Sequence, residues 1–250
     1  MKKIIVLLVV SMTLWSCDND DDKTSNKGVG ITFSESWDKS PVTFTDLNAT
    51  VFTNENGDNL QLDGLRYLIS NMVLTNNETG QSYQSGAGFF LRDISETTRT
   101  SPSLGFTVPP GTYKLSFIYG FSEEDNIDGE YENLNIVSWN WPEMLGGGYH
   151  FLQMDGSYNV NIEPSPFNFH NGTARVSDGV FEQNFVPFSF DDIEIGENSA
   201  MITINMDIAE WFKNPHTWNL NELDTQLMPN YTAQKMMQDN AQSVFSVSVE

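Results

Sequence analysis

Short segments in which apolar and polar side chains alternate follow one another from about residue 29 onward. In two of them, residues 113–119 and 202–208, every second side chain is apolar. A period of two indicates strands with one buried face and one solvated face. By the same pattern we expect further strands over residues 31–37, 42–52, 65–74, 89–94, 149–154 and 157–162.

Turn-forming residues separate these segments and set the fold class. They occur at Asn56-Gly57-Asp58, Pro109-Pro110-Gly111, Asp155-Gly156 and Asp178-Gly179. Asn, Asp, Gly and Pro favour the backbone conformations of tight turns. Many short strands with such connections are typical of an antiparallel β-sandwich, and we predict an all-β fold of that kind.

Helical spacing occurs only near the end of the sequence. Apolar side chains four residues apart predict one amphipathic helix over residues 231–244, directly after Pro229. A shorter helical turn is expected over residues 209–212. The alternating tail, residues 245–249, is expected to add a last strand. The fold prediction is therefore an antiparallel β-sandwich with a C-terminal helix, in a single domain over residues 29–250.

The N-terminal segment predicts export and a lipid anchor. Lys2 and Lys3 precede an apolar run over residues 4–15, which is typical of a secretory signal. Leu14-Trp15-Ser16-Cys17 resembles a bacterial lipobox, although Trp15 is bulkier than is usual there. We expect residues 1–16 to be the signal peptide and Cys17 to be lipidated. The alternative is an ordinary signal peptide with an incidental cysteine.

An acidic stretch without apolar residues follows the cysteine and predicts where in the cell the protein lies. Residues 17–28 have the composition of a flexible tether. The acidic run Asp18–Asp22 resembles the signal that sends Bacteroidetes lipoproteins to the outer face of the outer membrane. A solvated charge run in the tether is the alternative. We therefore expect an outer-membrane lipoprotein exposed at the cell surface.

Charge and composition exclude several classes of function. The 250 residues include 12 Lys and Arg against 34 Asp and Glu, a net charge of -22. A chain of that charge does not neutralise phosphates, so we expect no nucleic-acid partner. A single cysteine allows no intrachain disulfide and no Cys-cluster zinc or iron–sulfur site. With three histidines and no recognisable catalytic motif, we expect a binding protein and not an enzyme. A glycan-processing enzyme is an alternative that rests only on abundant acids and aromatics.

The least usual segment carries two tryptophans and three consecutive glycines, over residues 139–151. In an extended chain Trp139 and Trp141 point to one side, where they fill a core or line a cleft. His150 should point away from the face that carries its neighbours Tyr149 and Phe151. On residue types alone, core packing is the better explanation of this segment.

A set of short motifs, in order along the chain, resembles the copper-binding MbnP-like family of methanobactin-associated proteins and their MopE relatives. The motifs are Leu65–Asn71, Trp139-Asn140-Trp141, Gly148–Phe151, Phe169-His170-Asn171-Gly172 and the ending Asn240 to Phe245. The resemblance as a whole runs from about residue 30 to 250. The resemblance implies an extracytoplasmic β-sandwich that binds Cu(I) through histidine and a kynurenine made by oxidising a tryptophan. It also implies a di-haem peroxidase-like (MbnH-type) partner as the oxidant.

Carried onto this sequence, the resemblance makes His170 the first candidate ligand and Trp139 or Trp141 the modified residue. His150 is a further candidate, and His216 is expected to lie in a loop. Family members often have a Met-His pair before the last helix, whereas here Met228 is followed by Pro229. We expect copper storage, uptake or delivery, with a TonB-dependent transporter as another possible partner. The alternative is a non-metal binding or adhesion lipoprotein that keeps the fold but has lost the site.

Overall fold

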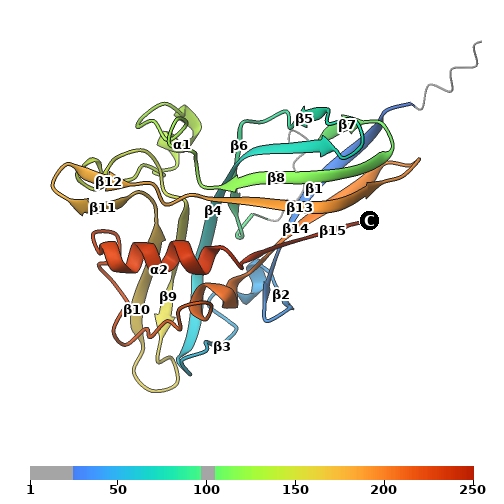
Figure 1. The fold of residues 1–250 in the computed structure, drawn as a ribbon. Coiled ribbons are helices and arrows are strands. Elements are labelled where there is room, and N and C mark those ends of the chain that lie inside the picture. Colours follow the sequence, from blue (N-terminus) through green and yellow to red (C-terminus); the bar gives the residue numbers. More distant parts are fainter. Residues whose placement is uncertain (1–24, 97–104) are drawn as a thin grey trace, which may run out of the picture.

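The computed structural model describes residues 25–96 and 105–250, and the chain there is built mainly of strands (Figure 1). The strands are β1 (Lys27–Trp37), β2 (Ser40–Val42), β3 (Phe52–Thr53), β4 (Asn59–Asn76), β5 (Ser82–Gln84), β6 (Phe89–Asp93), β7 (Phe106–Val108), β8 (Gly111–Tyr119), β9 (Leu152–Tyr158), β10 (Ser165–Asn171), β11 (Ala174–Ser177), β12 (Val180–Glu182), β13 (Val186–Ile195), β14 (Ala200–Asp207) and β15 (Phe245–Val249). The helices are α1 (Glu132–Ile136) and α2 (Tyr231–Ala241), with 3₁₀ turns η1 (Phe44–Asp46), η3 (Glu143–Leu145) and η4 (Ile208–Phe212).

The first sheet joins the two ends of the chain. Its strand order is β15-β14-β1-β2, with β7 paired to β1. β1 and β14 run parallel, from Val29 opposite Ala200 to Ser36 opposite Asp207, while the other pairs are antiparallel. The sheet is therefore mixed, because its two central strands come from opposite ends of the sequence.

The second sheet is organised around the 18-residue strand β4. Its order is β10-β9-β4-β8-β13, and β3, β5 and β6 also pair with β4. The N-terminal part of β4 pairs with β9 and the C-terminal part with β8, as the long strand in Figure 1 illustrates. The register shifts between Ser70 and Val73, where Asn71 has a φ of 52°. That irregularity bends β4, so one strand belongs to both halves of the sheet.

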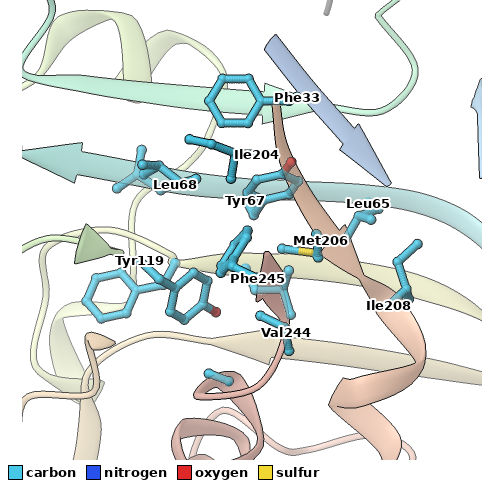
Figure 2. Close-up of a cluster of buried hydrophobic side chains, with 14 of the residues drawn as sticks. Phe33, Leu65, Tyr67, Leu68, Tyr119, Ile204, Met206, Ile208, Val244 and Phe245 are labelled. Atoms are coloured by element: carbon cyan, nitrogen blue, oxygen red, sulfur yellow. The ribbon is translucent and has the colours of Figure 1, made fainter. Parts of the chain in front are cut away.

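The core lies between the two sheets. Figure 2 shows Phe33, Ile204, Met206 and Phe245 of the first sheet facing Tyr67, Leu68 and Tyr119 of the second. Each of these side chains is buried, and the Phe33 and Tyr67 rings meet edge to face at 6.3 Å between centroids. Alternating apolar residues thus supply both inner faces, and the predicted all-β sandwich with a C-terminal helix is confirmed.

The prediction of a strand over residues 42–52 is wrong. Only the short strands β2 and β3 lie at its ends, and the 3₁₀ turn η1 lies between them. The Thr43 N–H donates to the Asp46 carboxylate at 2.8 Å, and the Asp46 N–H donates to the Thr43 carbonyl at 3.0 Å. The Asp46 side chain thus caps a helical turn that the backbone bond closes, and this local structure overrides the apolar alternation.

The turn expected at Asp155-Gly156 is also wrong. Both residues lie inside β9, which continues to Tyr158 and replaces the two strands expected over residues 149–154 and 157–162. A Cβ on Gly156 would lie 2.1 Å from the Gln61 carbonyl oxygen. Glycine is therefore required here by the close approach of β4 and not by a turn.

The first and last elements of the described sandwich lie close to the elements expected there. β1 begins at Lys27, four residues before the strand expected over residues 31–37. α2 begins after Asn230, whose side chain accepts a hydrogen bond from the Ala233 N–H, and β15 follows as expected. The signal peptide, Cys17 and the tether up to residue 24 lie outside the described residues. In the described part of the chain, no helix is long and apolar enough to cross a bilayer.

Candidate metal site

The outer face of β4, β9 and β10 carries a row of polar side chains. Arg66, Gln153 and His170 lie side by side in the register of the three strands. Residues on either side of them face inward, as the buried Met154 and Phe169 show. An Arg66 guanidinium nitrogen donates to Gln153 Oε1. The strands therefore present one imidazole and one guanidinium on a face that would otherwise be solvated.

The tryptophan-rich segment covers this row. Its two arms are joined by a bridge between Asn140 and Tyr149, in which the His150 N–H donates to the Trp139 carbonyl at 2.9 Å. Gly146, Gly147 and Gly148 all have positive φ. A Cβ on Gly148 would lie 2.3 Å from Asn126 Oδ1. The triple glycine thus supplies the turn and the close packing that fold the segment back on itself.

Folding back brings the four predicted site residues together. Trp139 and Trp141 are 0% and 1% exposed, and His150 is 6% exposed. The His150 ring lies 5.5 Å from Trp139, 4.9 Å from Trp141 and 5.4 Å from His170, between centroids. Tyr149 and Phe151 pack elsewhere, against Phe121, Tyr131 and Tyr119. His150 does point away from its aromatic neighbours, and it points into this cluster.

Burial makes His150 a neutral base. Desolvation lowers its pKa to about 4, and the nearby His170 and Arg66 act in the same direction. Its Nδ1 lies 3.1 Å from the Trp139 carbonyl oxygen, which can only accept a hydrogen bond. Nδ1 therefore carries the proton, and Nε2 is the basic nitrogen of this ring.

His170 is held from the other side by a carboxylate. Its Nε2 lies 2.9 Å from Asp155 Oδ1, which also accepts a 2.7 Å hydrogen bond from Asn168 Nδ2. Partial burial favours the neutral acid, but the bonds from His170 and Asn168 outweigh it, so the pKa of Asp155 lies below its usual value. The His170 side chain is 18% exposed. The two imidazoles thus sit in one site with different contacts to solvent.

The two tryptophans differ in their surroundings. The Trp141 indole N–H donates to the Leu145 carbonyl at 3.2 Å. The indole nitrogen of Trp139 is buried and has no hydrogen-bond partner among the described residues. The Arg66 guanidinium carbon lies 5.0 Å from the Trp139 ring centroid, a cation–π distance. Trp139 therefore combines an unsatisfied donor with a fixed positive charge over its ring.

Helix α2 holds the end of β10 in place through a buried glutamine. Gln234 Nε2 donates to the His170 carbonyl at 2.8 Å and to the Leu227 carbonyl at 3.1 Å. Its Oε1 accepts from Asn171 Nδ2 at 3.1 Å and from the Gly172 N–H at 3.3 Å. Gln234 is fully buried, so this network fixes the backbone that directly follows the His170 side chain.

One cavity of about 150 Å³ opens beside the cluster. It is lined by Asp155, Gln153 and Arg66 together with Asp63, Asp93 and Ser95. Solvent therefore reaches Asp155, the carboxylate that contacts His170, along the β4–β9 side. The third histidine, His216, is not part of the site, and its Nε2 lies 2.9 Å from Asp239 Oδ2 on α2.

Sequence reasoning missed the residues that support the cluster. Asp155 was assigned to a turn, and neither Arg66 nor Gln234 was singled out. A usable signal was present for Asp155, because Gln153 and Asp155 alternate with apolar or small residues as one face of a strand does. Gln234 carries no such signal, because its role depends on contacts with residues of β10 that are distant in the sequence.

The fold and the site define a β-sandwich whose outer face holds a buried cluster of two histidines and two tryptophans. The family model for MbnP matches residues 26–235, and the chain belongs to the MbnP family. Among solved structures, MbnP from Methylosinus trichosporium is similar in fold, with a TM-score of 0.57 and 13% sequence identity over 90% of this chain and 99% of that one. A search of curated proteins found no match. Family membership suggests a copper-related role.

Proposed function

We propose that this protein binds Cu(I) outside the cytoplasm, with His150 and His170 as imidazole ligands. The observation that carries the proposal is the pair of rings 5.4 Å apart. In each ring one nitrogen is held by an acceptor, and the other makes no hydrogen bond within the described residues. Imidazole nitrogens are good copper ligands. His150 needs no deprotonation to bind a metal at neutral pH, because its pKa is about 4.

Two histidines leave room for a donor of another kind. Among the residues that the structure describes, no three His, Cys, Asp or Glu side chains form a metal-binding group. We propose that a kynurenine derived from Trp139 or Trp141 supplies this donor through its aromatic amine. The oxidant is a di-haem peroxidase-like partner. The unsatisfied indole nitrogen of Trp139, in contact with the His150 ring, supports a place for a polar group there.

The cellular setting of this proposal comes from the N-terminal sequence. A lipid on Cys17 and the acidic residues behind it support an outer-membrane lipoprotein at the cell surface. In that setting the protein stores, takes up or delivers copper, alone or with a TonB-dependent transporter. It acts as a binding protein and not as an enzyme.

The test is Cu(I) binding under anaerobic conditions, measured by competition with a chromophoric chelator. We expect His170→Ala and His150→Ala each to weaken binding by more than the roughly 10- to 100-fold that loss of an outer partner costs. His216→Ala is the matched control and should leave the affinity unchanged. Exposure to the peroxidase-like partner, followed by peptide mass analysis, should place kynurenine at Trp139 or Trp141.

Two results would count against the proposal. Binding no tighter than that of an unrelated acidic protein, or binding that survives both cluster substitutions, would exclude this copper site. The protein would then be better described as a lipoprotein that keeps the sandwich and binds something other than a metal.

A further inference from the structure

The two imidazoles of the candidate site are held in opposite tautomers. The Trp139 carbonyl accepts from His150 Nδ1, which leaves Nε2 as the basic nitrogen. Asp155 Oδ1 already accepts from Asn168 Nδ2, so it is an acceptor for His170 Nε2 as well, which leaves Nδ1 as the basic nitrogen. Neither free nitrogen makes a hydrogen bond in the described part of the chain. The protein thus selects a different ring nitrogen for each histidine.

Asp155 is itself fixed by the strands around it. It pairs with Asn168 across β9 and β10, and the Asn168 side chain donates to the same oxygen that His170 contacts. His170 lies opposite Gln153, two residues from Asp155 on the same face, so carboxylate and imidazole are diagonal neighbours in the sheet. Arg66, opposite Gln153 on β4, places a positive charge beside the pair. The carboxylate is therefore held in position by its neighbours on both adjacent strands.

A carboxylate fixed in this position matters to a metal ligand. A carboxylate bonded to the distal nitrogen of a histidine fixes the ring orientation and the tautomer, and makes the free nitrogen a stronger donor. His150 needs no such help, since its carbonyl partner lies in the backbone. His170, on the exposed side of the site, depends on the Asp155 side chain to fix its ring orientation and tautomer.

We propose that Asp155 is a positioning residue that holds His170 as its Nε2–H tautomer and so presents Nδ1 to copper, while the Trp139 carbonyl presents Nε2 of His150. This inference rests on the proposed function. It adds the donor atom of each ligand and a residue that acts on the metal only through His170.

The test combines a metal-free and a metal-bound measurement. In the metal-free protein, long-range ¹H–¹⁵N NMR of labelled histidine should report Nε2–H for His170 and Nδ1–H for His150. Asp155→Leu should release His170 into a mixture of tautomers and weaken Cu(I) binding by about 10- to 100-fold. Asp155→Asn keeps an acceptor oxygen and should retain the tautomer and most of the affinity. Asp239→Leu removes the corresponding partner of His216 and should change neither His170 nor copper binding.

The outcomes separate the two proposals. An unchanged His170 tautomer and unchanged Cu(I) affinity in Asp155→Leu would overturn the role of Asp155 while leaving the copper site in place. A wild-type protein that binds no Cu(I) would overturn the proposed function and, with it, the role of Asp155 toward the metal. Circular dichroism of each variant checks the fold. Asp155→Ala, which also removes the acceptor for His170 Nε2, keeps the test decisive if Asp155→Leu does not fold.

Discussion

Two histidine–carboxylate pairs in this protein share one contact and differ in their surroundings. His170 and His216 each place Nε2 2.9 Å from a carboxylate oxygen, of Asp155 and Asp239 respectively. The His170 side chain is 18% exposed and has a second imidazole 5.4 Å away. The His216 side chain is 37% exposed, and no aromatic or imidazole ring of the described residues packs against it.

The difference teaches what makes a pair of this kind a candidate metal site. A carboxylate can orient an imidazole anywhere on a protein surface, and most such pairs only tie two elements together. What distinguishes His170 is the buried tryptophan-rich segment above it, which brings a second imidazole close to the ring and shields much of it from water. The predictions below test that distinction, beginning with the largest expected effect.

The first prediction concerns the buried partner, His150, in the metal-free protein. Its pKa falls from 6.5 to about 4 on folding. Between these two pH values His150 is protonated in the unfolded chain and neutral in the folded protein. The stability from the neutral ring is therefore complete above pH 6.5 and lost as the pH falls to about 4, an effect of about 3 kcal/mol. Urea unfolding at neutral pH and at pH 4 should show that His150→Gln loses less stability than the wild type.

His216→Gln provides the control for this measurement. Because the His216 side chain is more than one third exposed, its removal should leave the acid sensitivity of the wild type in place. Equal acid sensitivity in His150→Gln and the wild type would show that His150 is solvated, which would contradict a buried imidazole in this site.

The second prediction concerns the packing of the tryptophan-rich segment, residues 139–151, over the two histidines. A Cβ on Gly172 would lie 2.6 Å from Trp141 Cδ2, in a ring that contacts His150. Gly172→Ala should therefore push the indole away and destabilise the protein by about 1–3 kcal/mol, measured by chemical denaturation. Gly196→Ala is the control, because no atom lies within 4 Å of its added Cβ. Equal stability of the two variants would mean that Trp141 can move away from the added methyl group at no measurable cost.

The sequence predicts the elements of this fold better than their connections. Alternation identified β8, β14 and β15, because each has one face in the core and one in water. It failed over residues 42–52, where a local cap overrides it, and at Gly156, where tertiary contact with β4 determines the residue. Neither the parallel pairing of β1 with β14 nor the bend of β4 has a local signal, since both depend on partners far away in the sequence.

The candidate site divides in the same way. The two tryptophans, His150 and His170 stand out by residue type and motif, and the structure places them in one cluster. The contact between His170 and Asp155 depends on the register of β9 and β10, which the misassigned turn concealed. Supporting residues are harder to find than candidate ligands, because their chemistry lies in what they touch.

The smallest expected effect belongs to the exposed pair. A double-mutant cycle of His216→Ala and Asp239→Ala should give a coupling energy below about 1 kcal/mol, because water competes for both side chains. The equivalent cycle of His170→Ala and Asp155→Ala should give a larger coupling, since Asn168 and Arg66 hold the carboxylate in place and the His170 ring is largely shielded. Both cycles are measured by urea unfolding of the metal-free protein. Equal couplings would mean that the cover of Trp139 and Trp141 does not strengthen the contact beneath it, and the difference between the two pairs would then be confined to the second imidazole.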